Sequence, residues 1–279
     1  MSKSSGKGSS YYKSFMTCPK KFEYEYIENL SIKNDREPLI IGEAFHVAMQ
    51  KWYTTIGDYE TRLNIAIEAA ILVIDNSSIV TKEDTMQYIC RMVEAYCNHY
   101  TVEDFKVIRS EMPIEIVLPS GIVYTVRLDL LIHRNGKYLV VDHKTTGLPL
   151  ATYFKTFSDD IQGVGYVYAA ARACGLPVEG IMINAVYKKR DKERSFEFGR
   201  DFIYKTEKDF KEFEELISYY EYSIEECKAD FDIVKTFFPK NRTQCVKFYG
   251  GALIECDFRR LCSFGDTKEM REAFYKEEE

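Results

Sequence analysis

The chain has 279 residues, with 38 Lys and Arg against 44 Asp and Glu, a formal net charge of −6, and 46% apolar residues. This composition excludes wholesale disorder, and a chain of this length buries roughly 75% of the surface that it exposes when unfolded. The net acidity does not favour indiscriminate binding of nucleic acid, although it leaves room for a local DNA-binding surface.

The chain shows no sign of a membrane span or a secretory signal. Its apolar runs are far shorter than the roughly 20 residues that a spanning helix needs. Residues 1–9 are rich in Ser and Gly and predict a flexible tail, without the apolar segment of a signal peptide. Eight cysteines in such a chain favour reduced thiols, so we expect a cytoplasmic protein.

Helical periodicity dominates the first third of the chain. A helix is predicted from Ser10 to about Tyr26, with a kink or break at Pro19. A loop around residues 34–38 follows. Cys90 and Cys97 lie seven residues apart on one helix face, which is typical of a core position. Further helices are predicted from just after Gly42 to about Tyr53, over 60–75 and over 83–100.

The middle of the chain has strand composition, and helices return after it. Strands are predicted over 114–118, 122–133, 137–144 and 180–187, and helices over 159–173 and 205–228. No linker interrupts this order, so we expect a single domain over residues 10–265, followed by an acidic tail over 266–279. Within that domain we expect a helical part at about 10–105, a sheet core at about 110–190 and a C-terminal helix with a cysteine segment at about 205–265.

A β-hairpin carries the strongest local signal. Asn135-Gly136 between two strand-like runs is the preferred two-residue turn of type I′, and such a turn sets the register of the strands. That register places Asp129 opposite Asp142. Lys144 is two residues from Asp142 and therefore shares its face.

Two opposed carboxylates repel, and a cation between them relieves the repulsion. An oxygen-liking divalent ion, Mg²⁺ or Mn²⁺, fits such a pair best. Lys144 beside it could hold a water or stabilise developing negative charge. The alternative is a surface hairpin with a polar outer face. The apolar run 139–141 is more typical of an interior strand, but local geometry leaves both interpretations open.

The strands around residues 127–132 and 140–147 resemble the PD-(D/E)xK nuclease superfamily. The pattern is an Asp on one strand, here Asp129, and a hydrophobic-D-x-K-T-G run on the next, here Val141-Asp142-His143-Lys144-Thr145-Thr146-Gly147 with one additional Thr. The order of motifs is similar to that of the RecB-like and AddB-like exonuclease branch, and also to CRISPR-associated adaptation nucleases and phage exonucleases. The resemblance implies an α/β, restriction-endonuclease-like core, a mixed central β-sheet flanked by helices, with a helical N-terminal region.

Further motifs extend the resemblance from residue 18 to residue 262. Gly42-Glu43-Ala44-Phe45-His46 is similar to the G-x-x-x-H of this branch, and Gln162-Gly163-Val164-Gly165-Tyr166 to its Q-x-x-x-Y. The resemblance implies that Mg²⁺ or Mn²⁺ is bound by His46, Asp129, Asp142 and the backbone carbonyl of His143. It implies that Lys144 orients the attacking water. Gln162 and Tyr166 would then position the scissile phosphate.

Four cysteines resemble the [4Fe-4S] ligands of the iron–sulfur members of this branch, in which one ligand lies far upstream of the other three. The candidates here are Cys18, Cys245, Cys256 and Cys262. The spacing from Cys245 to Cys256 departs from the family pattern, because ten residues separate them and a turn is expected at 249–252. Four thiolates could equally hold Zn²⁺, or the four residues could be plain thiols.

The resemblance implies a metal-dependent DNA exonuclease that acts on ends or single strands in recombination, repair or phage DNA processing. No nucleotide-binding G-x-x-x-x-G-K-[ST] run is present, so a helicase or recombination partner would supply any motor activity. The alternatives are a structure-selective endonuclease or nickase on the same fold, and a catalytically silent DNA-binding subunit. Glu115, on the strand before Asp129, is either part of the site or a polar residue that faces water.

Overall fold

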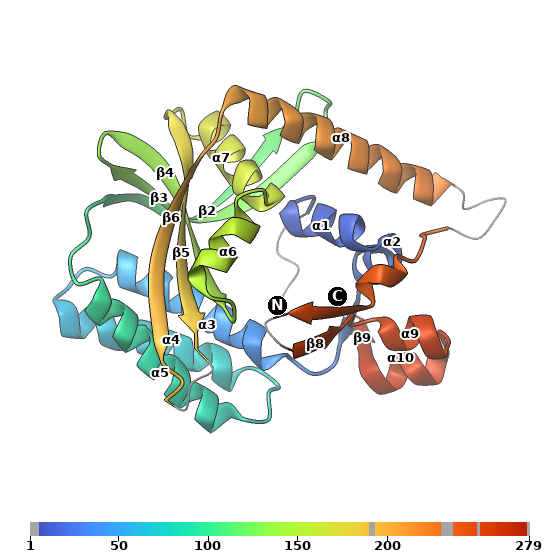
Figure 1. Cartoon of the computed structure of the whole chain (residues 1–279), viewed down its shortest axis with the longest axis horizontal. Coiled ribbons are helices and arrows are strands. Elements are labelled where there is room, and N and C mark those ends of the chain that lie inside the picture. Colours follow the sequence, from blue (N-terminus) through green and yellow to red (C-terminus); the bar gives the residue numbers. More distant parts are fainter. Residues whose placement is uncertain (1–5, 190–192, 230–236, 250–251, 278–279) are drawn as a thin grey trace. The chain divides into compact units, whose positions relative to one another are not determined.

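A computed structural model of the chain describes residues 6–189, 193–229, 237–249 and 252–277. The chain forms two compact units (Figure 1). The first unit comprises residues 1–33, 115–126 and 207–279, and the second comprises residues 34–114 and 127–206. A single nuclease domain over residues 10–265 stays a prediction.

The second unit begins with three helices, as the periodicity predicts. Helix α3 begins before the predicted Gly42, because Pro38 lies in the first turn, where a missing N–H breaks no helical hydrogen bond. The three helices share a core that includes Phe45, Met49 and Trp52, all of which are fully buried. They are α3 (Glu37–Thr54), α4 (Tyr59–Asp75) and α5 (Lys82–His99).

A five-stranded sheet in the order β2-β3-β4-β5-β6 follows. Strands β3 and β4 are antiparallel, β4 and β5 are parallel, and β5 and β6 are antiparallel. Helices flank this mixed sheet, which confirms the predicted α/β fold class. The strands are β2 (Lys106–Val117), β3 (Val123–Arg134), β4 (Lys137–Thr146), β5 (Val178–Lys188) and β6 (Phe196–Tyr204). Strand β6 was not predicted from the sequence.

The β3–β4 hairpin has the predicted register. Asn135 has a φ of 49° and Gly136 a φ of 80°, the two positive values that a type I′ turn requires. The antiparallel ladder runs from Arg134 opposite Lys137 to Leu130 opposite Val141. Asp129 therefore lies one residue beyond the last pair of the ladder.

Different helices cover the two faces of β4, β5 and β6. We call one the α7 face, because α7 (Ile161–Ala173) packs on it at Ile181, together with α6 (Leu150–Phe157) at Gly199. We call the other the α5 face, because Phe196 and Phe198 there pack with the core of α3 and α5. In Figure 1, α6 and α7 lie across β5 and β6 from α4 and α5. Helix α6 follows Pro149 and was not predicted from the sequence.

Gly180→Ala is expected to lower the free energy of unfolding by about 1–3 kcal/mol. A Cβ atom at Gly180 would lie 2.5 Å from the backbone carbonyl oxygen of Ile203, which cannot move without shifting β6. Gly163→Ala is the control, because its Cβ would meet only side-chain atoms, of Phe157 at 3.4 Å and of Ile181 at 3.9 Å, and alanine favours a helix by about 1 kcal/mol. Urea unfolding measures both variants. Equal losses in the two would contradict the packing argument.

The first unit contains the two ends of the chain. Its first helix ends at Thr17 and a new one begins at Pro19, so the predicted break is confirmed. Residues 266–277 contain α10 and β9. The elements are α1 (Ser9–Thr17), α2 (Pro19–Phe22), a π-helical turn (Glu23–Ile27), β1 (Leu30–Ile32), α8 (Glu207–Ala229), a 3₁₀ turn (Arg242–Gln244), β7 (Val246–Tyr249), β8 (Ala252–Glu255), α9 (Arg259–Phe264), α10 (Lys268–Phe274) and β9 (Tyr275–Glu277).

Short strands and a small apolar core hold this first unit together. Strand β1 pairs with β9 from Leu30 opposite Glu277 to Ile32 opposite Tyr275. Tyr24 and Phe258 pack with Leu30 and Tyr275 in one buried cluster, and Cys256 and Cys262 lie at its border.

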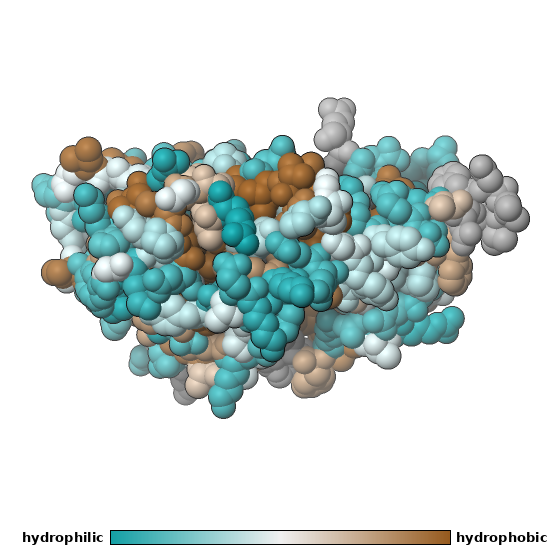
Figure 2. Space-filling view, turned by 90° about the horizontal axis from the view of Figure 1, so that it is seen from above, coloured by the Kyte–Doolittle hydropathy of each residue, from teal (hydrophilic) through white to brown (hydrophobic). Residues whose placement is uncertain are grey.

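The exposed surface mixes polar and apolar residues. Figure 2 shows one face on which hydrophilic residues predominate and apolar ones are interspersed. Within the described residues, no helix has the length and apolar character to cross a membrane.

Candidate active site

Three charged side chains of the β3–β4 hairpin lie on the α7 face of the sheet. Asp142 is 1% exposed, Asp129 is 13% exposed and Lys144 is 20% exposed. Burying two carboxylates and an ammonium group is costly unless the charges are paired. The hairpin therefore holds a concentrated charge cluster with limited access to solvent.

Asp129 is held by two partners. Its Oδ2 accepts a hydrogen bond from the backbone N–H of His143 at 2.7 Å and lies 3.2 Å from Nδ1 of His46, on α3. Burial opposes ionisation of Asp129, but the positive charge of His46 holds the pKa of its carboxyl well below the ordinary value. Burial likewise opposes protonation of His46, but Asp129 raises the pKa of that imidazole. Asp129 is thus a carboxylate at neutral pH.

Asp142 and Lys144 form an ion pair, with Nζ 2.9 Å from Oδ2. Burial raises the pKa of Asp142. Burial opposes the charge on Lys144, but Asp142 outweighs it and raises the pKa of the lysine. Oδ2 of Asp142 is thus occupied by Lys144, whereas Oδ1 is buried and accepts no hydrogen bond from the described residues. Asp142 therefore has unused acceptor capacity in a place that water hardly reaches.

Gln162 and Tyr166, on α7, extend the cluster. Lys144 Nζ donates to Oε1 of Gln162 at 3.4 Å, and Nε2 of Gln162 donates to the Tyr166 hydroxyl at 2.8 Å. The structure thus brings together the six side chains that the sequence motifs identify: His46, Asp129, Asp142, Lys144, Gln162 and Tyr166. Their spacing of four residues places Gln162 and Tyr166 on one face of the helix.

The donor set suits a divalent cation. In the parts of the chain that the structure describes, no three His, Cys, Asp or Glu side chains are grouped closely enough to hold a metal ion. His46 and Lys144 instead pair with the two carboxylates. The unpaired Oδ1 of Asp142, together with the ionised Asp129, nevertheless supplies the hard oxygen ligands that Mg²⁺ and Mn²⁺ prefer.

His143 points to the α5 face, away from the charges of its neighbours along β4. It is 2% exposed, and its ring stacks on Tyr53 at 5.6 Å between centroids. Its Nδ1 lies 2.6 Å from Nδ2 of Asn184. Burial lowers the pKa of His143 to about 3.

Acid should therefore destabilise the protein through His143. The unfolded chain binds a proton there near pH 6.5 and the folded chain only near pH 3, so stability is full above pH 6.5 and falls as the pH drops toward 3. The slope is about 1.4 kcal/mol per pH unit. His143→Asn, which keeps an acceptor near Nδ1, should lack this slope in urea unfolding between pH 7 and 4.5. Parallel curves for the two proteins would contradict the prediction.

The four candidate cluster cysteines all lie in the first unit. Cys18 separates α1 from α2, Cys245 and Cys256 flank the β7–β8 hairpin, and Cys262 lies on α9. The hairpin brings its two flanking residues together, so that the Cys256 N–H donates to the Cys245 carbonyl at 2.9 Å. Burial raises the pKa of Cys256 and of Cys262, and the charges of the other cysteines of the set raise both further. The predicted turn residues 250–251 lie outside the described residues.

One acidic residue near the site was not predicted from the sequence. Glu115 is exposed on β2, whereas Glu111 on the same strand is half-buried. Burial first, and then the charge of Asp129, raise the pKa of Glu111. Glu111 has a φ of 45°, which is uncommon for a residue with a side chain and shifts the alternation of the strand. No pattern in the sequence reveals this backbone conformation.

Comparison with known proteins gives a family match and several matches to solved structures. The chain matches the family model of the PD-(D/E)XK nuclease superfamily over residues 9–263. Among solved structures, it is similar to a proposed exonuclease from Eubacterium rectale, with 13% identity over 84% of each chain and a TM-score of 0.48. It is also similar to the protein SSO0001, with 13% identity over 78% of this chain and 94% of that one, and a TM-score of 0.31. No curated protein gives a significant match.

Proposed function

The chain belongs to the PD-(D/E)XK nuclease superfamily, and on this basis we propose that it hydrolyses DNA phosphodiester bonds at the β3–β4 hairpin. The observation that carries the proposal is the presence, on one face of the hairpin, of Asp129 as an ionised carboxylate and of Asp142, whose buried Oδ1 accepts no hydrogen bond from the described residues. Lys144 lies beside them as a cation. This is the set of charges that metal-dependent hydrolysis of a phosphodiester needs.

A divalent cation would be held by Asp129, Asp142, the His143 backbone carbonyl and His46. When bound, it supplies charge neutralisation of the phosphate and acidifies water. His46 would bind it as a neutral imidazole, so the proton that Asp129 favours on this ring would have to leave first. Acidic pH is therefore expected to weaken activity.

Lys144 acts as a cation and not as a base. Its raised pKa keeps it protonated at neutral pH, so it donates hydrogen bonds and stabilises negative charge on the phosphate. Oε1 of Gln162 accepts a hydrogen bond from Lys144, and Nε2 of Gln162 donates one to the Tyr166 hydroxyl. The two α7 residues thereby fix the direction of the ammonium group.

The test is cleavage of end-labelled linear DNA and of circular DNA by anaerobically purified protein, with Mn²⁺, Mg²⁺ or EDTA. We expect metal-dependent loss of linear DNA with circles spared, which is the result for an exonuclease of the RecB-like and AddB-like branch. Cutting of circular DNA would show that the protein is an endonuclease and not an exonuclease. A folded protein that cuts neither substrate with either metal would overturn the proposal of nuclease activity. In that case a DNA-binding subunit would remain.

We further propose that Cys18, Cys245, Cys256 and Cys262 hold a [4Fe-4S] cluster with a structural role, with Zn²⁺ as the alternative. Four thiols from distant parts of the sequence act on one another electrostatically. Four thiolates suit both occupants, although no three of these side chains are grouped closely enough to hold a metal ion in the described residues, so binding would draw them together. Either one would cross-link Cys18 to the C-terminal segment within the first unit. We also propose that DNA ends are the substrate and that a helicase or recombination protein acts as a partner.

Cys256→Ser is expected to lower the melting temperature by several degrees and to remove the bound metal, because loss of one ligand opens the site. Cys227→Ser, on α8 of the same unit, is the control and should leave the bound metal unchanged. Differential scanning fluorimetry measures the first effect, and elemental analysis for iron and zinc measures the second. Unchanged melting and metal content in Cys256→Ser would remove the cluster from the proposal.

A further inference from the structure

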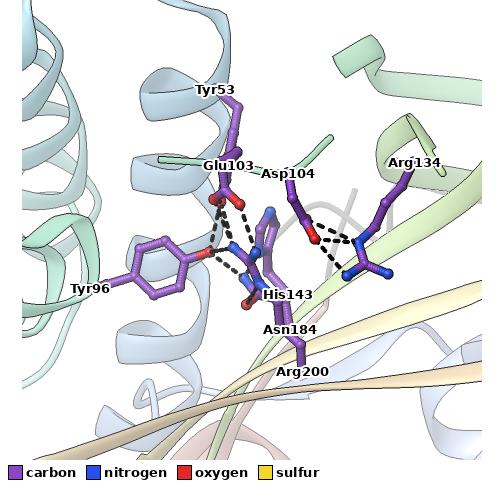
Figure 3. A network of polar contacts seen from close by, with 8 residues as sticks. All are labelled: Tyr53, Tyr96, Glu103, Asp104, Arg134, His143, Asn184 and Arg200. Atoms are coloured by element: carbon purple, nitrogen blue, oxygen red, sulfur yellow. Dashed lines mark hydrogen bonds and ion pairs between the residues drawn. The ribbon is translucent and has the colours of Figure 1, made fainter. Parts of the chain in front are cut away.

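We propose that Arg200 and Glu103 are positioning residues, which act through Asn184 to hold the His143 ring in a single tautomer and so fix the strand that carries Asp142 and Lys144. The catalytic part of this inference rests on the proposed nuclease function. We call the set of Arg200, Glu103, Asn184, His143, Tyr53 and Tyr96 the Arg200 network. All six lie in the second unit, and Figure 3 shows them converging on the α5 face.

The anchor of the network is an ion pair with two parallel hydrogen bonds. Arg200 donates from Nη1 to Oε2 of Glu103 at 2.6 Å and from Nη2 to Oε1 at 2.7 Å. The two side chains are 12% and 15% exposed. The guanidinium also lies 3.7 Å from the ring centroid of Tyr100. Such a fork is rigid, and it fixes the direction of the remaining Arg200 N–H groups.

The hydrogen bonds of two tyrosine hydroxyls each have a single possible direction. The Tyr53 hydroxyl donates to Oε1 of Glu103 at 2.6 Å, so its oxygen can only accept from the Tyr96 hydroxyl 2.7 Å away. The Tyr96 oxygen in turn accepts from Nη2 of Arg200 at 3.2 Å and from Nδ2 of Asn184 at 2.7 Å. The Tyr53 hydroxyl therefore donates to Glu103, and the Tyr96 hydroxyl donates to Tyr53.

Arg200 therefore decides which way the Asn184 amide points. Nε of Arg200 lies 3.2 Å from Oδ1 of Asn184, and a guanidinium has no acceptor. The amide oxygen must face Arg200, so its NH₂ group faces Tyr96 and His143. Because Asn184 donates to it, Nδ1 of His143 must be the unprotonated nitrogen. The single proton of the neutral ring is then on Nε2.

His143 transmits this arrangement to the opposite face of the sheet. Its ring is packed against Tyr53 on the α5 face, while its backbone N–H donates to Oδ2 of Asp129 at 2.7 Å. Asp129 lies beyond the end of the β3–β4 ladder, so this hydrogen bond takes the place of a regular strand pair there. A ring that could rotate would loosen the hold on the backbone at residue 143, which would then be positioned only by its pairing with Asn184 in the parallel ladder. The carboxylates would then lose their alignment.

The test compares Arg200→Lys with Arg134→Lys. Arg134 forms the same kind of pair with Asp104, at 2.6 Å from Nη2 to Oδ2, and lies over the Phe202 ring, but it does not contact Asn184. A lysine can keep one ion pair but cannot reach Glu103 and Asn184 together. Figure 3 shows both arginines.

The first readout is the ¹⁵N–¹H correlation spectrum of the His143 imidazole in metal-free protein. We expect a proton on Nε2 in the wild type and in Arg134→Lys, and a mixture of tautomers in Arg200→Lys. Asn184→Asp, whose carboxylate still accepts from Arg200 but cannot donate, should move the proton to Nδ1. This variant decides the question if Arg200→Lys does not fold. A wild-type proton on Nδ1, or an unchanged tautomer in both network variants, would overturn the inference.

The second readout is the Mn²⁺ concentration at half-maximal cleavage, together with the dissociation constant Kd for Mn²⁺. Arg200→Lys should raise both quantities at least tenfold and lower kcat, while KM for DNA stays unchanged. Arg134→Lys should leave all four values unchanged. A changed tautomer with unchanged Mn²⁺ dependence in folded protein would reduce the network to a stabilising role and contradict the proposal. If the wild type neither binds Mn²⁺ nor cleaves DNA, the nuclease function fails, whereas the tautomer experiment still tests the network.

Discussion

Asp142→Asn is expected to lower kcat/KM for DNA cleavage about a thousandfold or more while the protein keeps its fold. The amide has the shape of the carboxylate but not its charge, so it cannot neutralise a cation between Asp129 and residue 142. Loss of an interaction that a catalytic metal provides removes several kcal/mol of transition-state stabilisation. At about 1.4 kcal/mol per factor of ten, that is a loss of this size.

Stability should change much less than activity. Burial already disfavours the charge of Asp142, so a neutral amide removes a desolvation penalty, while Lys144 loses its partner but keeps some contact with solvent. Asp201→Asn is the matched control, because Asp201 lies on β6 of the same sheet, opposite Ile183. Initial rates at saturating Mn²⁺ and melting curves separate the two quantities. Activity within threefold of wild type in folded Asp142→Asn would contradict the assignment of Asp142 to the active site.

Arg200→Ala is expected to lower the free energy of unfolding by about 3–5 kcal/mol, the largest stability effect that we predict. The substitution leaves Glu103 in a mostly buried position without its bidentate partner. It also removes the donor to Asn184. An uncompensated buried charge accounts for most of the loss.

Arg134→Ala provides the comparison, with an expected loss of about 1 kcal/mol or less. Its partner Asp104 is 56% exposed, so water can replace the lost pair. Chemical denaturation at one pH and salt concentration measures both variants. Losses that differ by less than 1 kcal/mol would mean that burial does not set the energy of the Arg200 pair. The comparison also shows whether Arg200→Lys is mild enough for the spectroscopic experiment.

The β3–β4 hairpin could be predicted from the sequence because its information is local. Asn135 and Gly136 need a conformation that few other residues adopt, and a two-residue turn leaves one register for Arg134 and Lys137. Alternation along the strand then places Asp142 and Lys144 on one face. The motif resemblance added His46, Gln162 and Tyr166, which no strand geometry identifies.

The Arg200 network could not be predicted, because its members are brought together only by the tertiary fold. Glu103 follows α5, Asn184 lies within β5, and Arg200 is on β6, a strand that sequence patterns did not reveal. Asn184 gives the one usable hint, since it is the polar residue inside an otherwise apolar buried run of β5. Such a residue needs hydrogen-bonding partners, but the sequence does not identify them.

The parallel pairing of β4 with β5 has a consequence for the order of folding. The β3–β4 hairpin closes through two residues and can form within about 1–10 μs, whereas β5 can pair only after the chain has crossed over through α6 and α7. The contacts between Glu103 and Arg200 join residues that are much farther apart in the sequence than those of the hairpin, and such contacts form slowly. We therefore expect the hairpin that carries Asp129 and Asp142 to form before the side chains of the Arg200 network are in place. The final alignment of the two carboxylates would then be one of the last events in folding.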